Sequence, residues 1–185
     1  MSGLLKRLFL MFVIFAVLVA GVGLLLPSSW QVERSIVINA EPAAVHQLVD
    51  DLRQWPRWTP WTTQVDPTLK ITYGQTTSGA GASQTWTAEH HGNGTLKILT
   101  SDPASGITYR LSMNGGEFES DGAIRYEKTP EGTKVTWSAS GENGYDILKR
   151  YAGALFIEDA MGPDFEQGLS NLKKAVEPPQ PSAAP

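Results

Sequence analysis

The sequence predicts an α+β protein in which a curved antiparallel sheet wraps around a long C-terminal helix, preceded by one N-terminal transmembrane helix. Three observations support this prediction. Residues 8–26 form an uninterrupted apolar run. Between residues 69 and 139, about six short segments alternate apolar and polar side chains with the period of two that is typical of strands. Between residues 161 and 176, apolar side chains return at helical spacing, as on one face of a helix.

The N-terminal apolar run is long enough to cross a bilayer. Its 19 residues carry no charge and would rise roughly 28 Å as a helix, close to the ~30 Å thickness of the hydrocarbon layer. Lys6 and Arg7 precede the run, and positively charged flanks stay on the cytoplasmic side. We therefore expect a single-pass inner-membrane protein with residues 1–7 in the cytoplasm, a transmembrane anchor at 8–26 and the remaining chain outside the cytoplasm.

A cleaved signal peptide is the alternative interpretation of the same segment. Gly21 and Gly23 form a small-x-small pattern like that of a cleavage site. However, the apolar run continues through residues 24–26, and the apolar core of a signal peptide is usually shorter, about 7–15 residues. The length of the run favours an uncleaved signal anchor.

Charge and cysteine content argue against several classes of function. The chain beyond residue 26 carries all 19 acidic residues but 13 of the 15 Lys and Arg residues, a net charge of −6. This balance argues against nucleic acid and against an anionic membrane surface as partners. Because the chain has no cysteine, it cannot form a disulfide framework, a thiolate nucleophile or a thiolate metal site.

Residues 30–177 are predicted to form one domain, and the Pro- and Ala-rich residues 178–185 are predicted to be a disordered tail. The domain begins with a strand in which Val32, Ile36 and Ile38 alternate with polar residues. A helix follows, with Pro42 at its start and an apolar face formed by Val45, Leu48, Val49 and Leu52.

The next segments alternate strictly and predict strands with one apolar face each. Turn-forming sequences such as SGAG, HGNG, DPASG and TPEG separate them. The side chains predicted to point inward are Leu69, Ile71, Tyr73, Trp86, Ala88, Leu96, Ile98, Ile107, Tyr109, Leu111, Met113, Ile124, Tyr126, Val135, Trp137 and Ala139. Since the other face of each strand is polar, we expect an antiparallel sheet that is covered on one side.

The C-terminal helix is predicted to cover that sheet. Its apolar stripe consists of Met161, Phe165, Leu169, Leu172 and Val176. Residues 146–161 are also helix-like, and Gly162–Pro163 is expected to break or kink the two pieces, because proline disrupts a helix interior. A curved sheet around this helix would leave a concave space between the two layers.

The order of these elements, together with several short motifs, resembles a known family. The motifs are WPRWTPW at 55–61, GAGASQTW at 79–86, GTKVTWSASGE at 132–142 and GPDFEQGLSNLKKAVE at 162–177. They are similar to the polyketide cyclase/dehydrase and lipid-transport family of the START/Bet v 1-like (SRPBCC) superfamily, in its membrane-anchored bacterial branch. The resemblance covers about residues 30–177. It implies the helix-grip fold and a deep apolar cavity, but not one activity, since the superfamily includes lipid carriers, cyclases and ligand receptors.

Large side chains on the inward faces are the candidates for a ligand pocket. They are Trp58, Trp61, Trp86, Tyr109, Met113, Tyr126, Trp137, Phe165 and Leu169. For any one of the sheet and helix side chains taken alone, a filled core is the favoured interpretation. Collectively, large side chains from both layers of a helix-grip fold favour a pocket with gaps.

The tryptophan-rich stretch is predicted to form a lid. Trp55, Trp58 and Trp61 are three residues apart, and Pro56 and Pro60 prevent a regular helix. This spacing suits a short tight turn that presents the rings on one side, packed over the open end of the sheet. A membrane-interface belt and a carbohydrate-stacking surface are the alternatives.

Histidines and carboxylates show no clear catalytic pattern. His90 and His91 are neighbours on a predicted strand end, so their side chains should point to opposite faces and cannot easily share a metal. His46 is expected at the surface of the first helix. Asp50–Asp51 and Asp102 have no visible partner that would tune them as general bases. The sequence therefore predicts no catalytic residue, no metal site and no cofactor, and it leans away from an enzyme.

The function predicted from these observations is a membrane-anchored binding protein. It would hold a hydrophobic or amphipathic small molecule, such as a lipid, between the sheet and the C-terminal helix. Its partners would be that ligand and, through the N-terminal helix, the membrane. A cyclase- or dehydrase-like enzyme using the same cavity and a structural envelope protein without a ligand are the alternatives.

Overall fold

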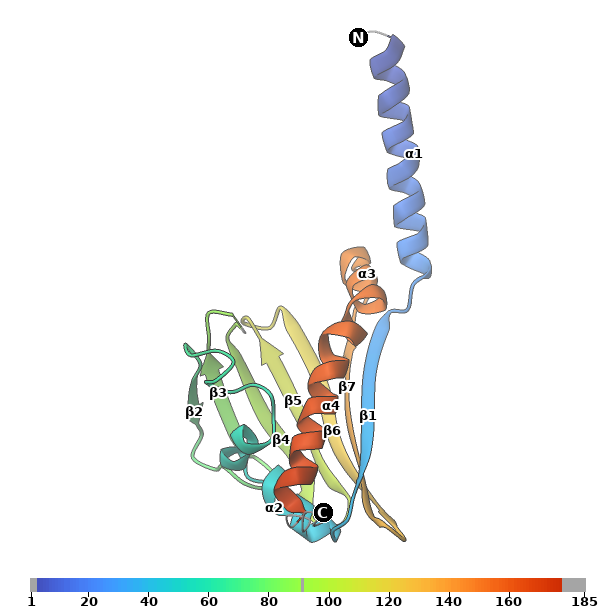
Figure 1. Ribbon diagram of the computed structural model, residues 1–185. Helices are drawn as coiled ribbons and strands as arrows, with labels where there is room; N and C mark the ends of the chain where they lie inside the picture. Colours follow the sequence, from blue (N-terminus) through green and yellow to red (C-terminus); the bar gives the residue numbers. More distant parts are fainter. Residues whose placement is uncertain (1–2, 91, 178–185) are drawn as a thin grey trace, which may run out of the picture.

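The computed structural model describes residues 3–90 and 92–177, and it confirms the predicted fold class (Figure 1). Within the described residues, seven strands form one antiparallel sheet in the order β1-β7-β6-β5-β4-β3-β2. The strands are β1 (Ser29–Ile38), β2 (Lys70–Tyr73), β3 (Ser83–Thr87), β4 (Gly94–Asp102), β5 (Gly106–Met113), β6 (Phe118–Thr129) and β7 (Gly132–Glu142). The tail predicted at residues 178–185 lies outside the described residues.

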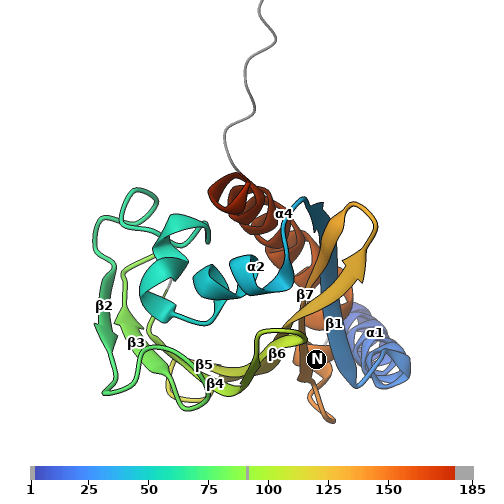
Figure 2. The same ribbon diagram turned by 90° about the horizontal axis from the view of Figure 1, so that it is seen from below.

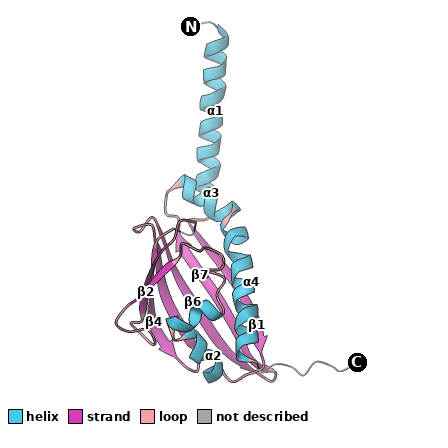
Figure 3. Cartoon of the chain, turned by 60° about the vertical axis from the view of Figure 1, so that its left-hand side comes forward, coloured by secondary structure: helices cyan, strands magenta, loops and turns pink. Residues whose placement is uncertain are grey.

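Helices precede, interrupt and follow the strands. They are α1 (Gly3–Leu25), α2 (Pro42–Val49), the short 3-10 helix η1 (Leu52–Arg57), α3 (Ile147–Leu155) and α4 (Ile157–Val176). Figure 2 shows α2 and the short helix after it inside the curve of the sheet, with α4 beside them. α1 extends away from the sheet, and α3 lies at the C-terminal end of α1 (Figure 3).

The register of the strands defines the end of the sheet that lies nearest α1. β1 begins just after α1 and pairs there with the last residues of β7. At the same end, Trp86 is opposite Gly94, Gly94 is opposite Met113, and Met113 is opposite Phe118. Since directly opposite residues in an antiparallel sheet share a face, these four positions form one row across the sheet.

The core of the domain contains an aromatic cluster, which we define as Trp58, Tyr109, Trp137 and Phe165. Each is at most 4% exposed. The ring of Trp137 stacks on that of Phe165, with centroids 4.2 Å apart and planes 6° apart. Gly168 permits this close approach of α4, because a Cβ there would lie 2.6 Å from Cζ3 of Trp137. Burial of each ring contributes roughly 1.5–3 kcal/mol to stability.

The helix break expected at Gly162–Pro163 is found elsewhere. α4 continues through both residues, and the boundary with α3 lies at Phe156, whose φ of −127° departs from helical values. The proline removes one backbone hydrogen bond from α4. Arg34 of β1 contacts α4 before and after this proline. The Arg34 guanidinium donates to Glu158 at 2.5 Å and to Glu166 at 2.6 Å. These two ion pairs attach the segments before and after Pro163 to β1.

α1 is a candidate membrane span by its length and composition. It has 23 residues, and 6% of its most apolar window is buried against the rest of the protein. Its rings Phe9, Phe12 and Phe15 are more than 60% exposed, and most of its aliphatic side chains are at least half exposed. A helix that is apolar on all sides and is not buried in a protein core is typical of a membrane span.

Candidate functional site

An inner cavity of about 310 Å³ lies between the sheet and the N-terminal half of α4. The sheet contributes Ile71, Gln84, Trp86, Leu96, Leu111, Met113 and Phe118 to its wall. The opposite wall consists of Trp55, Pro56, Thr59, Trp61, Leu69, Ile157, Met161 and Asp164. Its volume falls at the lower end of the ~300–1,000 Å³ range of small-molecule sites.

The sheet wall of the inner cavity consists of the two rows of side chains nearest α1. The first row contains Ile71, Trp86, Met113 and Phe118, and the second contains Gln84, Leu96 and Leu111. The next row, with Ile98 opposite Tyr109, is fully buried under other side chains. The cavity is therefore confined to the α1 end of the sheet.

Gly94 determines the shape of the cavity floor. A Cβ at this position would lie 2.2 Å from Cζ2 of Trp86, so the indole lies directly across the glycine backbone. Trp86 consequently extends along the sheet toward β4 instead of filling the space above it. A side chain at residue 94 would displace the ring.

Trp61 and Asp164 join the loop after η1 to α4. The indole N–H of Trp61 donates to Oδ2 of Asp164 at 2.9 Å, and the ring contacts Trp137 edge-on with centroids 5.7 Å apart. Asp66 holds the same loop to the segment that follows β3, since its fully buried carboxylate accepts the backbone N–H of His90 at 3.1 Å. These contacts fix the position of the Trp61 ring at the cavity.

Gln84 brings an unpartnered polar group to this largely apolar wall. Its side chain is 9% exposed, and its Oε1 has no hydrogen-bond partner among the described residues. A buried acceptor without a partner costs roughly 1–3 kcal/mol. A hydroxyl or amide of a bound molecule would provide the missing donor.

The residues predicted to line a pocket divide into two groups. Trp61, Trp86 and Met113 lie on the wall of the inner cavity. The others are packed in the core, each at most 8% exposed, and are Trp58, Tyr109, Tyr126, Trp137, Phe165 and Leu169. Wall residues that the sequence analysis did not name as pocket candidates include Leu96, Leu111, Phe118, Ile157 and Met161. Period-two alternation had already placed Leu96 and Leu111 on the inner face.

Hydrogen bonds explain why the tryptophan stretch is not simply a lid. Trp55 belongs to η1 and donates to the carbonyl of Val49 at 2.8 Å. Trp58 donates to the carbonyl of Leu48 at 3.0 Å and is 0% exposed. Trp58 therefore lies in the core rather than at the cavity mouth, while Trp55 and Trp61 contribute to the cavity wall.

Two buried tyrosines remain neutral at physiological pH. Burial raises the pKa of Tyr109 to about 12, and its hydroxyl accepts the indole N–H of Trp137 at 2.8 Å. Burial also raises the pKa of Tyr126, and the charge of Asp50 acts in the same direction. Both hydroxyls therefore act as hydrogen-bonding groups of the core.

His46, Asp50 and Ser101 form a polar network at the opposite end of the sheet from α1. His46 was expected at the surface but is 8% exposed, because α2 turns this face toward the sheet. Its Nδ1 lies 3.4 Å from the Tyr126 hydroxyl, and its Nε2 lies 3.2 Å from Oγ of Ser101. The carboxylate of Asp50 is 3.6 Å from the same Nε2.

The geometry of this network differs from that of a nucleophilic triad. In a triad, the imidazole lies between the hydroxyl and the carboxylate, each on its own ring nitrogen. Here Ser101 and Asp50 share Nε2 of His46, and Ser101 donates directly to Asp50. None of the three lines the inner cavity. The network joins α2 to β4, and the residues 3–90 and 92–177 contain no cluster suited to a metal ion.

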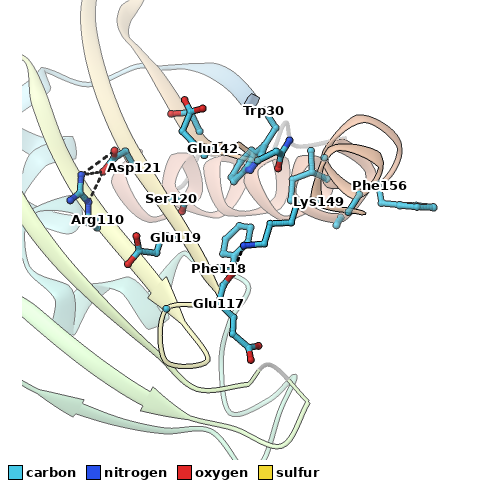
Figure 4. Close-up of a pocket in the computed structure, with 18 residues that line it drawn as sticks. Trp30, Arg110, Glu117, Phe118, Glu119, Ser120, Asp121, Glu142, Lys149 and Phe156 are labelled. Carbon is cyan, nitrogen blue, oxygen red and sulfur yellow. Dashed lines mark hydrogen bonds and ion pairs between the residues drawn. The ribbon is translucent and has the colours of Figure 1, made fainter. Parts of the chain in front are cut away.

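Figure 4 shows the side chains that line a second hollow, the outer groove. It measures about 600 Å³ and is bounded by the start of β6, the end of β7 and helices α3 and α4. Trp30 and Phe118 stack at its floor, with centroids 5.5 Å apart. Phe118 and Ile157 line both hollows, so these two side chains separate the groove from the cavity.

Comparison with protein families gives one match over most of the chain. Residues 29–177 match the family model described as polyketide cyclase / dehydrase and lipid transport. No curated protein sequence matches the chain.

Solved structures share the fold at low sequence identity. A protein of unknown function from Staphylococcus aureus has a TM-score of 0.60 at 13% identity, over 80% of this chain and 93% of its own. A protein from Chromobacterium violaceum gives 0.57 at 15%, over 81% and 99%. Ara h 8.0201, with a Bet v 1-like fold, gives 0.51 at 19%, over 80% and 94%. These similarities establish the architecture and not the ligand.

Proposed function

Because the chain belongs to the polyketide cyclase/dehydrase and lipid transport family, we propose that its helix-grip domain binds a hydrophobic or amphipathic small molecule in the inner cavity. The observation that carries this proposal is the composition of the cavity wall. Aromatic, aliphatic and methionine side chains dominate it, and Thr59, Gln84 and Asp164 add polar groups. Small-molecule sites usually combine an apolar lining with a few polar groups that orient the ligand.

The size and polarity of the cavity restrict the ligand. A volume of about 310 Å³ suits a compact ring system or a single acyl chain better than a whole two-chain lipid. Gln84 offers the ligand a buried acceptor without a partner of its own. The preferred ligand is therefore apolar over most of its surface, with a hydroxyl or amide donor.

Binding is favoured over cyclase- or dehydrase-like catalysis. Such catalysis needs a proton donor or acceptor placed at the reacting atoms. Asp164 is the ionisable side chain in the cavity wall, and it accepts the indole N–H of Trp61. A purely structural role is disfavoured because a protein that needed only stability would gain dispersion contacts by filling this space.

We further propose that residues 8–26 stay in the membrane as an uncleaved anchor. Residues 1–7 would remain in the cytoplasm, and the domain of residues 30–177 would lie outside it. Support comes from the 23-residue length of α1 and from Lys6 and Arg7 before it. Protease added to spheroplasts should digest the domain, and alkaline carbonate should leave the protein in the membrane pellet.

The binding proposal can be tested by filling the cavity. We would purify the full chain from membranes and identify co-purifying small molecules by organic extraction and mass spectrometry. Leu111→Trp fills the cavity, whereas Leu99→Trp changes an exposed side chain of β4 and is the matched control. A ligand enriched with the parent and with Leu99→Trp, but lost from Leu111→Trp, supports the proposal. Equal extracts from all three proteins contradict it.

A further inference from the structure

The C-terminal end of α1 is joined to α3 by several hydrogen bonds. Arg150 of α3 is 7% exposed, and its guanidinium donates to the carbonyls of Leu24 at 2.6 Å and Leu26 at 3.1 Å. Leu24 lies in the last turn of α1 and Leu26 directly follows the helix; since carbonyls at a helix C-terminus have no partner within the helix, a cation there is favourable. The hydroxyl of Tyr151 also donates to the carbonyl of Val19 at 2.9 Å.

Close packing accompanies these hydrogen bonds. Gly23 is the buried residue of α1, and a Cβ there would lie 2.4 Å from Cγ2 of Ile147. Small residues at such positions let two helices approach closely. α3 therefore lies directly against the last two turns of α1.

The depth of α3 relative to a bilayer follows from this contact. If Lys6 and Arg7 lie at the cytoplasmic boundary, the ~30 Å hydrocarbon layer ends about 20 residues later, near Leu26. Val19, which α3 contacts, would then lie roughly 10 Å inside that boundary. Helices that lie in the membrane interface bury their apolar face to about 5–10 Å.

The face of α3 that points away from the domain is apolar. Leu148 is 80% exposed, Leu155 58% and Phe156 64%, and Tyr145 just before the helix is 89% exposed. From residue 147 to 157 the chain has no acidic side chain and carries the basic pair Lys149 and Arg150. Such an exposed apolar stripe is a place for contact with a partner.

We propose that α3 docks on the outer surface of the same bilayer that α1 spans, with Leu148, Leu155 and Phe156 inserted between head groups and acyl chains. This rests on the proposal that α1 is a retained anchor. We infer that lipid covers this apolar stripe. The stripe begins beside the C-terminal end of α1, and the depth derived above places it within the membrane interface. The net charge of −6 beyond residue 26 makes apolar insertion, rather than attraction to anionic lipids, the driving force.

Docking of α3 places the outer groove at the membrane. Lys149, Gly153 and Phe156 of this region line the groove (Figure 4), while Phe118 and Ile157 separate it from the inner cavity. A molecule leaving the bilayer beside α3 would thus enter the groove first and reach the cavity by displacing these two side chains.

Single-cysteine labelling can locate α3, because the chain has no cysteine of its own. We would attach an environment-sensitive fluorophore to full-length Leu148→Cys and Phe156→Cys in zwitterionic vesicles. The lipids would be supplied with or without a nitroxide on the upper acyl chain. Phe12→Cys in α1 is the positive control, and Leu99→Cys on β4 is the exposed apolar control.

The expected result is loss of most fluorescence at residues 12, 148 and 156, with little change at 99. Quenching at 12 without quenching at 148 and 156 overturns the docking of α3 while leaving the anchor intact. No quenching at 12 overturns the anchor and, with it, this proposal. A label at residue 148 whose emission is blue-shifted but is not quenched by the lipid nitroxide would mean that protein, such as a second copy of the chain, covers the stripe. That result also overturns the docking proposal. Melting curves show that each variant is folded.

Discussion

The two halves of the concave face are built from the same types of residue and are packed differently. In the closed half, Ile98, Tyr109 and Trp137 of the sheet are covered by Trp58 and Phe165, and all five are at most 4% exposed. In the cavity half, nearest α1, Trp86, Leu111 and Met113 of the sheet lie beneath open space. Both halves have the same inward alternation of apolar side chains.

The side chains on the covering elements account for the difference. In the closed half, Trp58, which directly follows η1, meets the Trp137 ring edge-on with centroids 5.2 Å apart, and Phe165 of α4 stacks on it at 4.2 Å. In the cavity half, Trp55 and Trp61 line one wall, but α4 presents Ile157 and Met161 and no aromatic ring. The contribution of α4 therefore differs between the two halves: an aromatic ring in the closed half and aliphatic or thioether side chains in the cavity half.

The largest predicted effect is on the closed half. Trp58→Ala and Trp137→Ala should each destabilise the protein by about 3–5 kcal/mol, because each removes a fully buried ring and leaves a cavity. Far-UV circular dichroism during urea unfolding, with the full chain in mild detergent, measures this loss.

Met161→Ala in the cavity half is the matched comparison. Its side chain already borders open space, so truncation creates less new cavity and should cost nearer 1–2 kcal/mol. Equal losses for Met161→Ala and Trp137→Ala would mean that both halves are packed alike.

The alternation of residues along each strand predicted which side chains face inward, but not which half stays open. Trp86 and Met113 are on the cavity wall because the register aligns them across Gly94, and that alignment is a property of three strands together. Tyr109, two rows further on, has the same alternation and is covered. Local sequence patterns contain no information on the position of the covering helix.

Trp58 and His46 illustrate the same limit of sequence reasoning. Both lie in segments that mix apolar and polar residues. We therefore predicted that Trp58 belongs to a lid and that His46 lies at the surface. Instead, Trp58 donates to the carbonyl of Leu48, and His46 contacts Tyr126 of β6. Each of these side chains is buried by a contact that depends on how α2 packs in the fold.

The next prediction concerns the floor of the cavity half. Gly94→Ala should displace the Trp86 ring, since the new methyl group would meet it at 2.2 Å. We expect a loss of about 1–3 kcal/mol, as for other overpacked sites, together with weaker retention of any co-purifying ligand. Unfolding midpoints and extracted ligand are measured on the same samples. Unchanged ligand retention in Gly94→Ala would show that Trp86 does not limit the cavity.

Removing one polar group from each half should change stability in opposite directions, and the change in the cavity half is the smallest effect that we predict. In the cavity half, Gln84→Leu should stabilise the ligand-free protein by roughly 1 kcal/mol, because it removes a buried amide oxygen without a partner. In the closed half, Tyr109→Phe should destabilise it by about 1–3 kcal/mol, since the buried indole N–H of Trp137 would lose its acceptor. Urea unfolding of both variants tests the pair. Gln84→Leu should also release a co-purifying ligand that donates to Oε1. Destabilisation of both variants to the same extent would mean that the Gln84 amide is already satisfied in the free protein, and that the ligand need not carry a donor.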